Sequence, residues 1–207
     1  MITLYHSPRS RSARPRWLLE EIGAAYELVT LDLAKQEHLS AAHRQRHPHA
    51  KVPVLVDGDL ALIESAAICL HLADRFPAAQ LAPPVGTPER GRYYQWMVYA
   101  IATLEPPVLQ VFLHTVRLPE AERSAAQAAA GRAQFAEVAQ VLTDALGGHP
   151  FLLGERFSAA DVLLGMACYF LRQFGIVQDE PVLFAYIERC MARPALQRAL
   201  ALETVPA

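Results

Sequence analysis

The sequence predicts two parts, an α/β domain followed by an all-α domain. Over roughly the first 75 residues, short apolar runs with a strand pattern alternate with runs at helical spacing. A proline-rich stretch follows, with Pro77, Pro83, Pro84 and Pro88, and beyond it apolar residues recur only at helical spacing. We therefore expect domains at residues 1–77 and 88–207, joined by a linker at residues 78–87.

The first domain should begin with a strand, a helix and a second strand. The first strand is Ile2–Tyr5, and a polar turn separates it from the helix. Ser12 is the candidate N-cap of that helix, Pro15 falls in its first turn, where a missing N–H is tolerated, and Gly23 ends it. The second strand is Tyr26–Leu31. A strand–helix–strand order of this length favours a parallel pair with a right-handed crossover.

A hairpin and a helix should complete the first domain. Residues 32–50 are polar and without a clear period, which predicts a loop with one irregular helical turn. Asp57-Gly58 between two short apolar runs predicts a hairpin with a two-residue turn. A helix over Ser65–Arg75 follows, so the order becomes βαβ–ββα around one mixed sheet.

The second domain is expected to be helical throughout. A long helix over Glu89–Val116 should kink at Pro106-Pro107, because proline removes a helical hydrogen bond and clashes with the preceding turn. The remaining expected helices are Pro119–Leu146, one that begins at Ser158, Val182–Ala192 and Pro194–Leu202.

Composition argues against several classes of partner. The 19 basic and 21 acidic residues are interspersed, which disfavours nucleic acid. There is no basic-then-apolar leader and no apolar run near the ~20 residues that cross a membrane. The three cysteines, Cys69, Cys168 and Cys190, lie in apolar helical patterns and indicate reduced thiols in a cytoplasmic protein. The histidines of residues 38–49 match no zinc spacing, so we expect no metal.

The strongest functional signal is the triplet Lys51-Val52-Pro53 together with the pair Glu64-Ser65, which begins eleven residues after Pro53. Pro53 opens the first strand of the hairpin, and Glu64 and Ser65 stand where the second strand passes into the helix. This junction supplies a carboxylate, a hydroxyl and unpaired helix N-terminal N–H groups. Together they predict a receptor for a peptide-like ligand that carries both charge signs.

A second motif is Gly154-Glu155-Arg156-Phe157-Ser158-Ala159-Ala160-Asp161, in which the Ser158 hydroxyl can accept from the Asp161 N–H while the Asp161 carboxylate accepts from the Ser158 N–H. With both motifs in register, essentially the whole chain resembles the cytosolic glutathione S-transferase family, in particular a serine-type bacterial member of unassigned subclass. The resemblance implies a thioredoxin-like N-terminal domain that binds glutathione and an all-helical C-terminal domain on the side of a hydrophobic substrate. It also implies a homodimer, and glutathione as co-substrate without a metal.

The resemblance further implies roles for individual residues in holding glutathione. The Val52 backbone would pair with the cysteinyl amide, as an added strand does, with a cis peptide bond before Pro53. Ser65 would bind the γ-glutamyl carboxylate through its hydroxyl and N–H, and Glu64 would face the ammonium group.

At the glycyl end, the resemblance places Lys51 and His38 near the second carboxylate. The preceding loop departs from the family, which usually has Asn-Pro-Xaa-Gly where this chain has His47-Pro48-His49-Ala50. This departure leaves the conformation of the loop open.

The thiol-activating residue has three candidates. Ser10 falls where serine- and cysteine-type members carry their catalytic side chain, and a hydroxyl there could donate to the thiolate beside helix N-terminal N–H groups. Ser12 and Tyr5 are the alternatives. Arg9 and Arg11 beside Ser10 could add positive potential.

The sequence favours an enzyme that adds the glutathione thiolate to small hydrophobic electrophiles, a detoxification activity. Two alternatives stay open: a non-catalytic ligand-binding or protein-docking member of the same fold, and a specialised glutathione-dependent lyase, isomerase, dehalogenase or peroxidase. The first loop has no cysteine, which disfavours glutaredoxin-like thiol chemistry.

Overall fold

The protein is described by a computed structural model that places residues 1–173, 175 and 180–201. These residues form two compact units. One unit is Met1–Gln80 together with the C-terminal segment that begins at Arg193, and the other is Leu81–Ala192.

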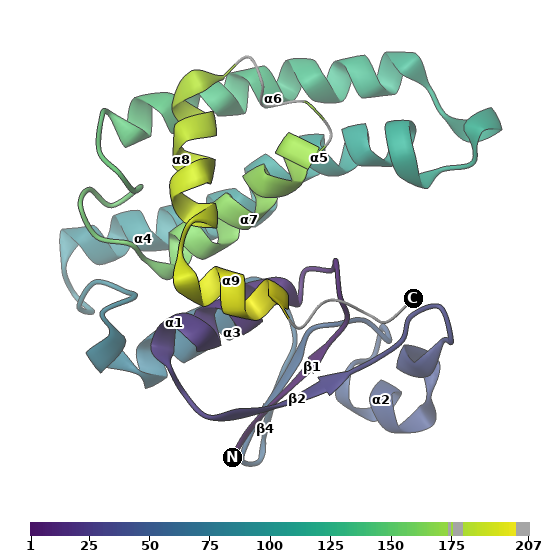
Figure 1. Cartoon of the computed structure of the whole chain (residues 1–207), viewed down its shortest axis with the longest axis vertical. Coiled ribbons are helices and arrows are strands. Elements are labelled where there is room, and N and C mark those ends of the chain that lie inside the picture. The colour runs from purple at the N-terminus through teal and green to yellow at the C-terminus, as the bar shows by residue number, and fades with distance from the viewer. Residues whose placement is uncertain (174, 176–179, 202–207) are drawn as a thin grey trace. The chain divides into compact units, whose positions relative to one another are not determined.

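The first unit is built on a four-stranded mixed sheet in the order β2-β1-β3-β4 (Figure 1). Its strands are β1 Ile2–His6, β2 Tyr26–Thr30, β3 Val54–Asp57 and β4 Leu60–Leu62. Strand β1 is parallel to β2 and antiparallel to β3, with Leu4 opposite both Leu28 and Leu55. The predicted mixed sheet and parallel β1–β2 pair are confirmed.

Helices cover both faces of this sheet (Figure 1). Helices α1 (Ala13–Ile22) and α3 (Ser65–Arg75) pack together on one face, and the short α2 (Ala41–Arg46) lies on the other. Both predicted long helices have the expected limits, and Gly23 ends α1 with the positive φ of 71° that favours glycine. The core between sheet and helices is apolar and fully buried, with Leu4, Trp17, Leu18, Leu55, Ile68 and Leu72.

The hairpin turn lies one residue further along the chain than predicted. Asp57 pairs with Leu60 as the last ladder rung, so the turn residues are Gly58 and Asp59. Of these two residues only Gly58 has a positive φ, 62°, which is the pattern of a type II′ turn with glycine first. Asp57 is buried instead, and its carboxylate accepts from the His71 Nε2–H and from Arg75 on α3.

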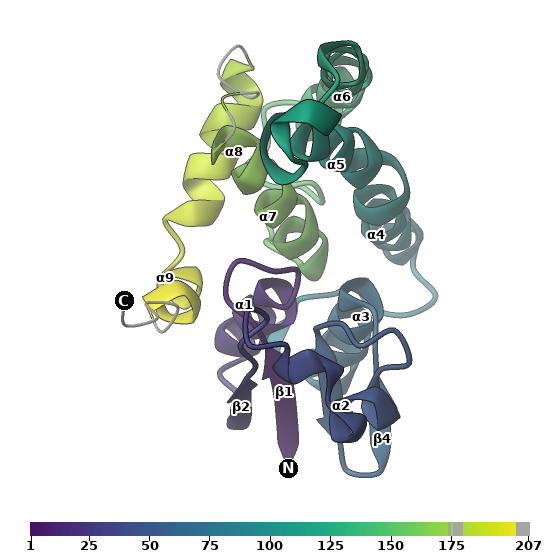
Figure 2. The same cartoon turned by 90° about the vertical axis from the view of Figure 1, so that its right-hand side faces the viewer.

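The last helix, α9 (Pro194–Ala201), belongs to the first unit and packs on α1, as Figure 2 shows. Two ion pairs fix it: Arg193 donates to both oxygens of Glu21 at 2.6 and 2.8 Å, and Arg198 donates to Glu20 at 2.9 Å. The sequence pattern alone places this helix with the all-helical domain, at residues 88–207. Its expected last residue, Leu202, lies outside the described residues.

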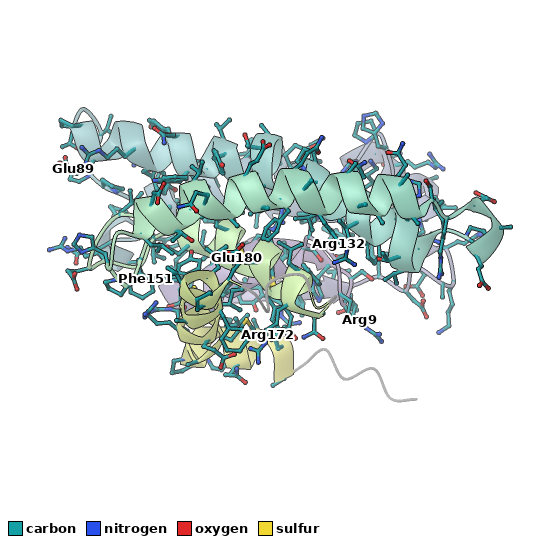
Figure 3. The ribbon with its side chains drawn as sticks, turned by 90° about the horizontal axis from the view of Figure 1, so that it is seen from above. Arg9, Glu89, Arg132, Phe151, Arg172 and Glu180 are labelled. Atoms are coloured by element: carbon teal, nitrogen blue, oxygen red, sulfur yellow. The ribbon has the colours of Figure 1, made fainter. Side chains whose placement is uncertain are left out.

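The second unit is all helical, as predicted, with α4 (Pro88–Tyr99), α5 (Glu105–Phe112), α6 (Ala125–Leu146), α7 (Ala159–Gln173) and α8 (Pro181–Met191). Between α4 and α5 the chain stays helical through a π-helical turn, Ala100–Leu104. Pro106 and Pro107 follow in the first turn of α5, directly after the π-helical turn, where the wider turn accommodates their missing N–H groups. The kink expected at these prolines stays a prediction. Helix α6 lies beside α5 (Figure 3).

Helix α6 begins later than expected. Pro119 is followed by a short 3-10 turn, and the helix starts after Ser124, whose hydroxyl accepts from the Gln127 N–H. The long run Pro88–Arg117 passes a length and composition test for a membrane span within the described residues. The core helix of a globular domain passes the same test, so this is weak evidence for a span.

The capping motif before α7 is built differently from the predicted box. The Asp161 carboxylate accepts from the Ser158 N–H at 2.8 Å, as expected, but the Ser158 hydroxyl also donates to it, at 2.9 Å. The Leu152 N–H and the Tyr186 hydroxyl donate to its other oxygen. Burial raises the pKa of Asp161, and these four donors oppose that rise. Asp161 therefore joins a loop and two helices at one buried carboxylate.

Candidate functional site

The loop after β1 carries a buried chain of hydrogen bonds that runs from a serine to an arginine. The Ser10 and Ser12 hydroxyls lie 2.6 Å apart, and Ser12 Oγ lies 2.8 Å from His6 Nδ1. The other ring nitrogen, His6 Nε2, lies 3.3 Å from an Arg16 guanidinium nitrogen. Ser12, His6 and Arg16 are buried, whereas Ser10 is partly exposed. Ser10 is therefore the member of this chain that is in reach of a ligand.

The turn into α1 places the Ser10 hydroxyl. The Ala13 N–H donates to the Ser10 carbonyl, so the chain turns before the helix begins. The Ser10 hydroxyl donates to the Ser7 carbonyl at 2.7 Å and accepts from the Ser12 N–H at 3.2 Å. Ser12 occupies the N-cap position, as predicted, but its side chain makes no helix cap and instead accepts from the Ser7 N–H at 3.0 Å.

Tyr5, the third candidate for thiol activation, lies apart from the two serines. Successive side chains of a strand point to opposite faces of the sheet, so Tyr5 and His6 on β1 diverge. The Tyr5 ring packs against His43 at 5.8 Å and beneath the Arg46 guanidinium at 4.9 Å, both on α2. The structure therefore brings Ser10 and Ser12 together and places Tyr5 on the other face.

The charge state of His6 follows from its surroundings. Burial, and then the positive charge of Arg16, lower the pKa of His6 to about 4, against a smaller opposing effect of a hydrogen bond with Ser12. His6 is therefore neutral at physiological pH. A neutral imidazole offers one donor and one acceptor nitrogen.

The start of α3 forms a second polar site. Ser65 is buried at the first position of the helix, and Arg14 on α1 donates to its hydroxyl at 3.2 Å. Glu64 before it is exposed, with φ 69° and ψ 113°, a conformation that residues with a side chain rarely adopt. Such strain, which costs on the order of 1–3 kcal/mol, is concentrated at functional sites.

The contact between Arg14 and Ser65 has a consequence for electrostatics. Because Arg14 lies in the first turn of α1 and Ser65 in the first turn of α3, the N-termini of both helices face one region. Helix N-termini carry partial positive charge, and the buried guanidinium adds a full one. The region is thus suited to bind a carboxylate.

The segment before β3 has the predicted cis peptide bond between Val52 and Pro53. His43 on α2 is buried, and its Nε2–H donates to the Lys51 carbonyl at 2.9 Å. This bond ties α2 to the residue that precedes Val52. Val52 itself is half-buried and Lys51 is exposed.

The loop that departs from the family pattern keeps a tight turn. Ala50 adopts a positive φ of 49°, and its N–H donates to the His47 carbonyl. The His47 ring nitrogen Nδ1 accepts from the His49 N–H at 3.2 Å, which is a turn that an asparagine side chain commonly makes. His38, the other candidate for the glycyl end, lies in a separate 3-10 turn, Glu37–Leu39, and is half-buried.

Sequence reasoning missed His6, Arg14, Arg16 and His43. The two arginines carried a signal that could have been used, because a cation in the first turn of a helix opposes the helix dipole and calls for a reason. The burial of His6 and His43 depends on tertiary packing and has no local signal. Within the described ranges, no three His, Cys, Asp or Glu side chains are grouped so as to hold a metal ion.

Two family models match this chain. The model described as "Glutathione S-transferase, N-terminal domain" matches residues 1–74, and the one described as "Glutathione S-transferase, C-terminal domain" matches residues 104–194. The first match contains both polar sites described above. The second contains α5 to α8 and the Asp161 centre.

Known proteins of the same description are similar over nearly the full length. Glutathione S-transferase 4 of Zea mays is 30% identical over 191 residues, which cover 87% of this chain and 82% of that protein. A solved glutathione transferase of Methylococcus capsulatus is 29% identical with a TM-score of 0.87, and the match covers 98% of both chains. A sphingomonad glutathione S-transferase complexed with glutathione is 30% identical with a TM-score of 0.85, over 98% of this chain and 99% of that one. The chain is a member of the glutathione S-transferase family.

Proposed function

We propose that this protein is a glutathione transferase that adds the glutathione thiolate to small hydrophobic electrophiles. One observation carries the proposal most strongly: a hydroxyl donor at Ser10 and an anion site at Ser65 belong to the same unit, joined through α1 by the Arg14–Ser65 hydrogen bond. The sphingomonad relative, which has the same fold, was solved with glutathione bound.

The tripeptide would be held by its ends and its central amide. Ser65 offers its hydroxyl and the α3 N-terminus to the γ-glutamyl carboxylate, with Arg14 behind it, and Glu64 faces the ammonium. The Val52 backbone, positioned by the His43–Lys51 hydrogen bond, pairs with the cysteinyl amide.

The glycyl carboxylate completes the binding scheme. Lys51 and His38 are the side chains proposed for it. Lys51 is exposed, so solvent screens its charge, and we expect it to contribute less to glutathione affinity than the Ser65 site does.

The chemical step requires a thiolate, and Ser10 is the proposed activating residue. The thiol proton leaves to solvent, and the Ser10 O–H turns from the Ser7 carbonyl to donate to the sulfur anion. A sulfur lone pair then forms the new S–C bond, and either a leaving group departs with its electron pair or a proton is taken up on the adduct. Stabilisation of the anion lowers the thiol pKa, and each unit of lowering corresponds to about 1.4 kcal/mol of stabilisation.

A binding measurement and a substrate panel test this function. We expect the protein to bind immobilised glutathione and to conjugate it to small aromatic halides or activated alkenes. Retention without turnover on any electrophile or peroxide would support the non-catalytic alternative, and turnover confined to an isomerisation or dehalogenation substrate would support a specialised enzyme. No retention on glutathione would contradict the proposal.

We further propose that the protein is a cytoplasmic homodimer that serves in detoxification. The cysteines are buried, and burial raises the pKa of Cys69 and Cys168 to about 12, which suits inert thiols in a reducing compartment. The dimer would join α3 of one subunit to α4 of its partner. Helix α4 carries exposed apolar residues, Tyr94 and Val98, on one side.

A further inference from the structure

Two buried groups near Ser10 have no place in the transfer reaction as proposed. His6 is 1% exposed at the end of β1, and Arg16 is 1% exposed on α1. They continue the hydrogen-bond chain that begins at the Ser10 hydroxyl. Burying two such polar groups beside a catalytic hydroxyl costs free energy unless their hydrogen bonds are satisfied, so we ask what their hydrogen bonds do to Ser10.

The protons of the chain can be assigned from the chemistry of its two ends. A guanidinium has only donors, so Arg16 donates to His6 Nε2, which must then be the acceptor nitrogen. The proton of the neutral ring therefore lies on Nδ1 and is donated to Ser12 Oγ. This assignment rests on the Arg16 contact and on burial, which keeps His6 neutral.

The two serine hydroxyls continue this pattern of donors and acceptors. Ser12 Oγ accepts from His6 and also from the Ser7 N–H, so both of its lone pairs are used. The Ser12 O–H must therefore donate either to Ser10 Oγ at 2.6 Å or to the Ser7 carbonyl at 3.1 Å. The shorter contact is the stronger hydrogen bond. Ser10 Oγ then accepts from Ser12, and its own proton remains available to donate.

We propose that His6 is a positioning residue that acts through Ser12 to keep the Ser10 hydroxyl oriented as a donor toward the bound thiolate. The inference rests on the proposed function of Ser10. In the unliganded protein the Ser10 proton goes to the Ser7 carbonyl, and the thiolate replaces that acceptor. His6 takes up no proton in this scheme, because Nδ1 is already protonated and Nε2 accepts from Arg16.

The scheme predicts what happens when the donor at His6 is lost. Without it, Ser12 regains a free lone pair, and Ser10 can donate to Ser12 instead of the sulfur. Donation from Ser12 to Ser10 then competes with donation from Ser10 to Ser12, so the thiolate loses part of its stabilisation. We expect the pKa of the bound thiol to rise by about 0.5–1 unit and conjugation at neutral pH to slow about 3- to 10-fold.

The decisive experiment compares two substitutions of His6. His6→Leu removes the donor at similar volume, and His6→Asn keeps an amide N–H near the position of Nδ1. The pKa of the bound thiol is measured from the pH dependence of the ultraviolet absorbance of the thiolate, with glutathione affinity by calorimetry. We expect His6→Leu to raise the thiol pKa, His6→Asn to restore it at least in part, and neither to change the affinity measured below the thiol pKa.

A matched control is His71→Leu. His71 also donates to a buried side chain, Asp57, but Asp57 pairs with Ile2 at the opposite end of β1 from His6. It should therefore lower stability without moving the thiol pKa. A shift as large as that of His6→Leu would overturn the inference, because any destabilisation of the unit would then produce it.

A double-mutant cycle tests whether His6 acts through Ser12. In this scheme Ser12→Ala removes both the hydroxyl that donates to Ser10 and the oxygen that would compete for the Ser10 proton, so His6→Leu should raise the thiol pKa in the wild-type background but not in the Ser12→Ala background. An equal shift in both backgrounds, or an unchanged pKa in folded His6→Leu, would overturn the inference; if His6→Leu does not fold, His6→Phe, which also lacks the donor, decides in the same way. A wild-type protein that does not lower the thiol pKa would contradict the proposed function, whereas a lowered pKa that depends on Ser10 but not on His6 would contradict this inference alone.

Discussion

At Ser65 three sources of positive potential act on one hydroxyl: the α3 N-terminus, the neighbouring α1 N-terminus and the Arg14 guanidinium. Arg14 occupies a lone pair of the Ser65 oxygen, so the Ser65 proton is left to donate to a ligand. A serine in this setting binds an anion more strongly than a serine that only caps a helix.

This difference can be measured. Ser65→Ala should weaken glutathione binding by about 1.5–3 kcal/mol, because it removes a charge-assisted partner at a buried position, whereas Glu64→Ala should weaken it by about 0.5–1 kcal/mol, because Glu64 is exposed and solvent screens its charge. Calorimetry gives the affinities. Ser124→Ala, which removes a simple helix cap at the start of α6, is the control and should leave them unchanged. Unchanged affinity in both site variants would show that glutathione is held elsewhere.

Ser10→Ala addresses the chemical step. Loss of the donor should shift the pH–rate profile upward and slow conjugation at neutral pH about 10- to 1000-fold, while glutathione binding persists. Tyr5→Phe should have little effect, because Tyr5 lies on the other face of the sheet. A normal rate in Ser10→Ala with a collapse in Ser12→Ala would move the catalytic role to Ser12.

His6 should also link stability to pH. Its pKa is about 4 in the folded protein, below the ordinary 6.5, so between these values the unfolded chain binds a proton that the folded chain does not. The stabilisation that neutral His6 gives the folded state is complete above the pKa of the unfolded chain, 6.5, and is lost as pH falls toward about 4. Wild type should therefore lose about 3 kcal/mol more unfolding free energy than His6→Asn between neutral pH and about pH 4. Urea titrations at the two pH values provide the comparison, and equal losses would show that His6 is not buried as described.

At this scale the sequence identified the residues that have a local reason to stand where they do. Ser65 begins a helix and Ser10 precedes one, and both positions can be inferred from neighbours in the chain. His6 has no such local signal, because it is buried only when β1 meets α1.

Among the secondary-structure elements, the start of α7 depends on a single buried carboxylate. Asp161 accepts from two backbone N–H groups and two hydroxyls, which come from the loop at Leu152, the cap at Ser158 and Tyr186 on α8. Its loss would leave several of these donors buried without an acceptor.

Asp161→Ala should therefore lower the unfolding free energy by about 2–4 kcal/mol, more than a simple helix cap contributes. Tyr186→Phe, which removes one of the four donors, should cost about 1 kcal/mol. Thermal and chemical denaturation measure both. If Asp161→Ala kept wild-type stability yet lost turnover, the carboxylate would have a functional role rather than a structural one.

Element limits could be predicted where the stop and start signals are local. Helix α3 has the expected limits because a strand pattern gives way to a helical one at Ser65, and α1 ends at Gly23 because glycine accepts the positive φ. The sequence predicts a start of α6 that is too early, because proline is a common first residue of helices, but Pro119 precedes a separate turn. The π-helical turn before Pro106 has no pattern of its own in the sequence.

For the whole molecule, the proposed dimer gives the clearest test. Light scattering at micromolar concentration should give twice the mass of one chain. Val98→Glu, at a position 61% exposed on α4, should shift the protein toward monomer. Val141→Glu, 45% exposed on α6, is the matched control and should not. A monomeric wild type, or equal effects of the two substitutions, would contradict an interface at α4.

The fold class and the family could be predicted at this scale because the strand and helix periods change once, at the proline-rich stretch. The placement of α9 could not, because its partners on α1 are far away in sequence. The chain pattern shows that Pro194–Ala201 is helical but not what it packs against.

The position of α9 also has a consequence for biosynthesis. Glu21 pairs with an arginine 172 residues later, so the first unit is completed by a helix that is synthesised after the whole second unit. While the ribosome extends the chain, α1 lacks the partner that covers one of its sides, and the intervening helical unit can fold before the N-terminal unit is closed. The packing of α1, the helix that follows Ser10 and carries Arg14, is therefore completed only after residues 81–192 have been synthesised.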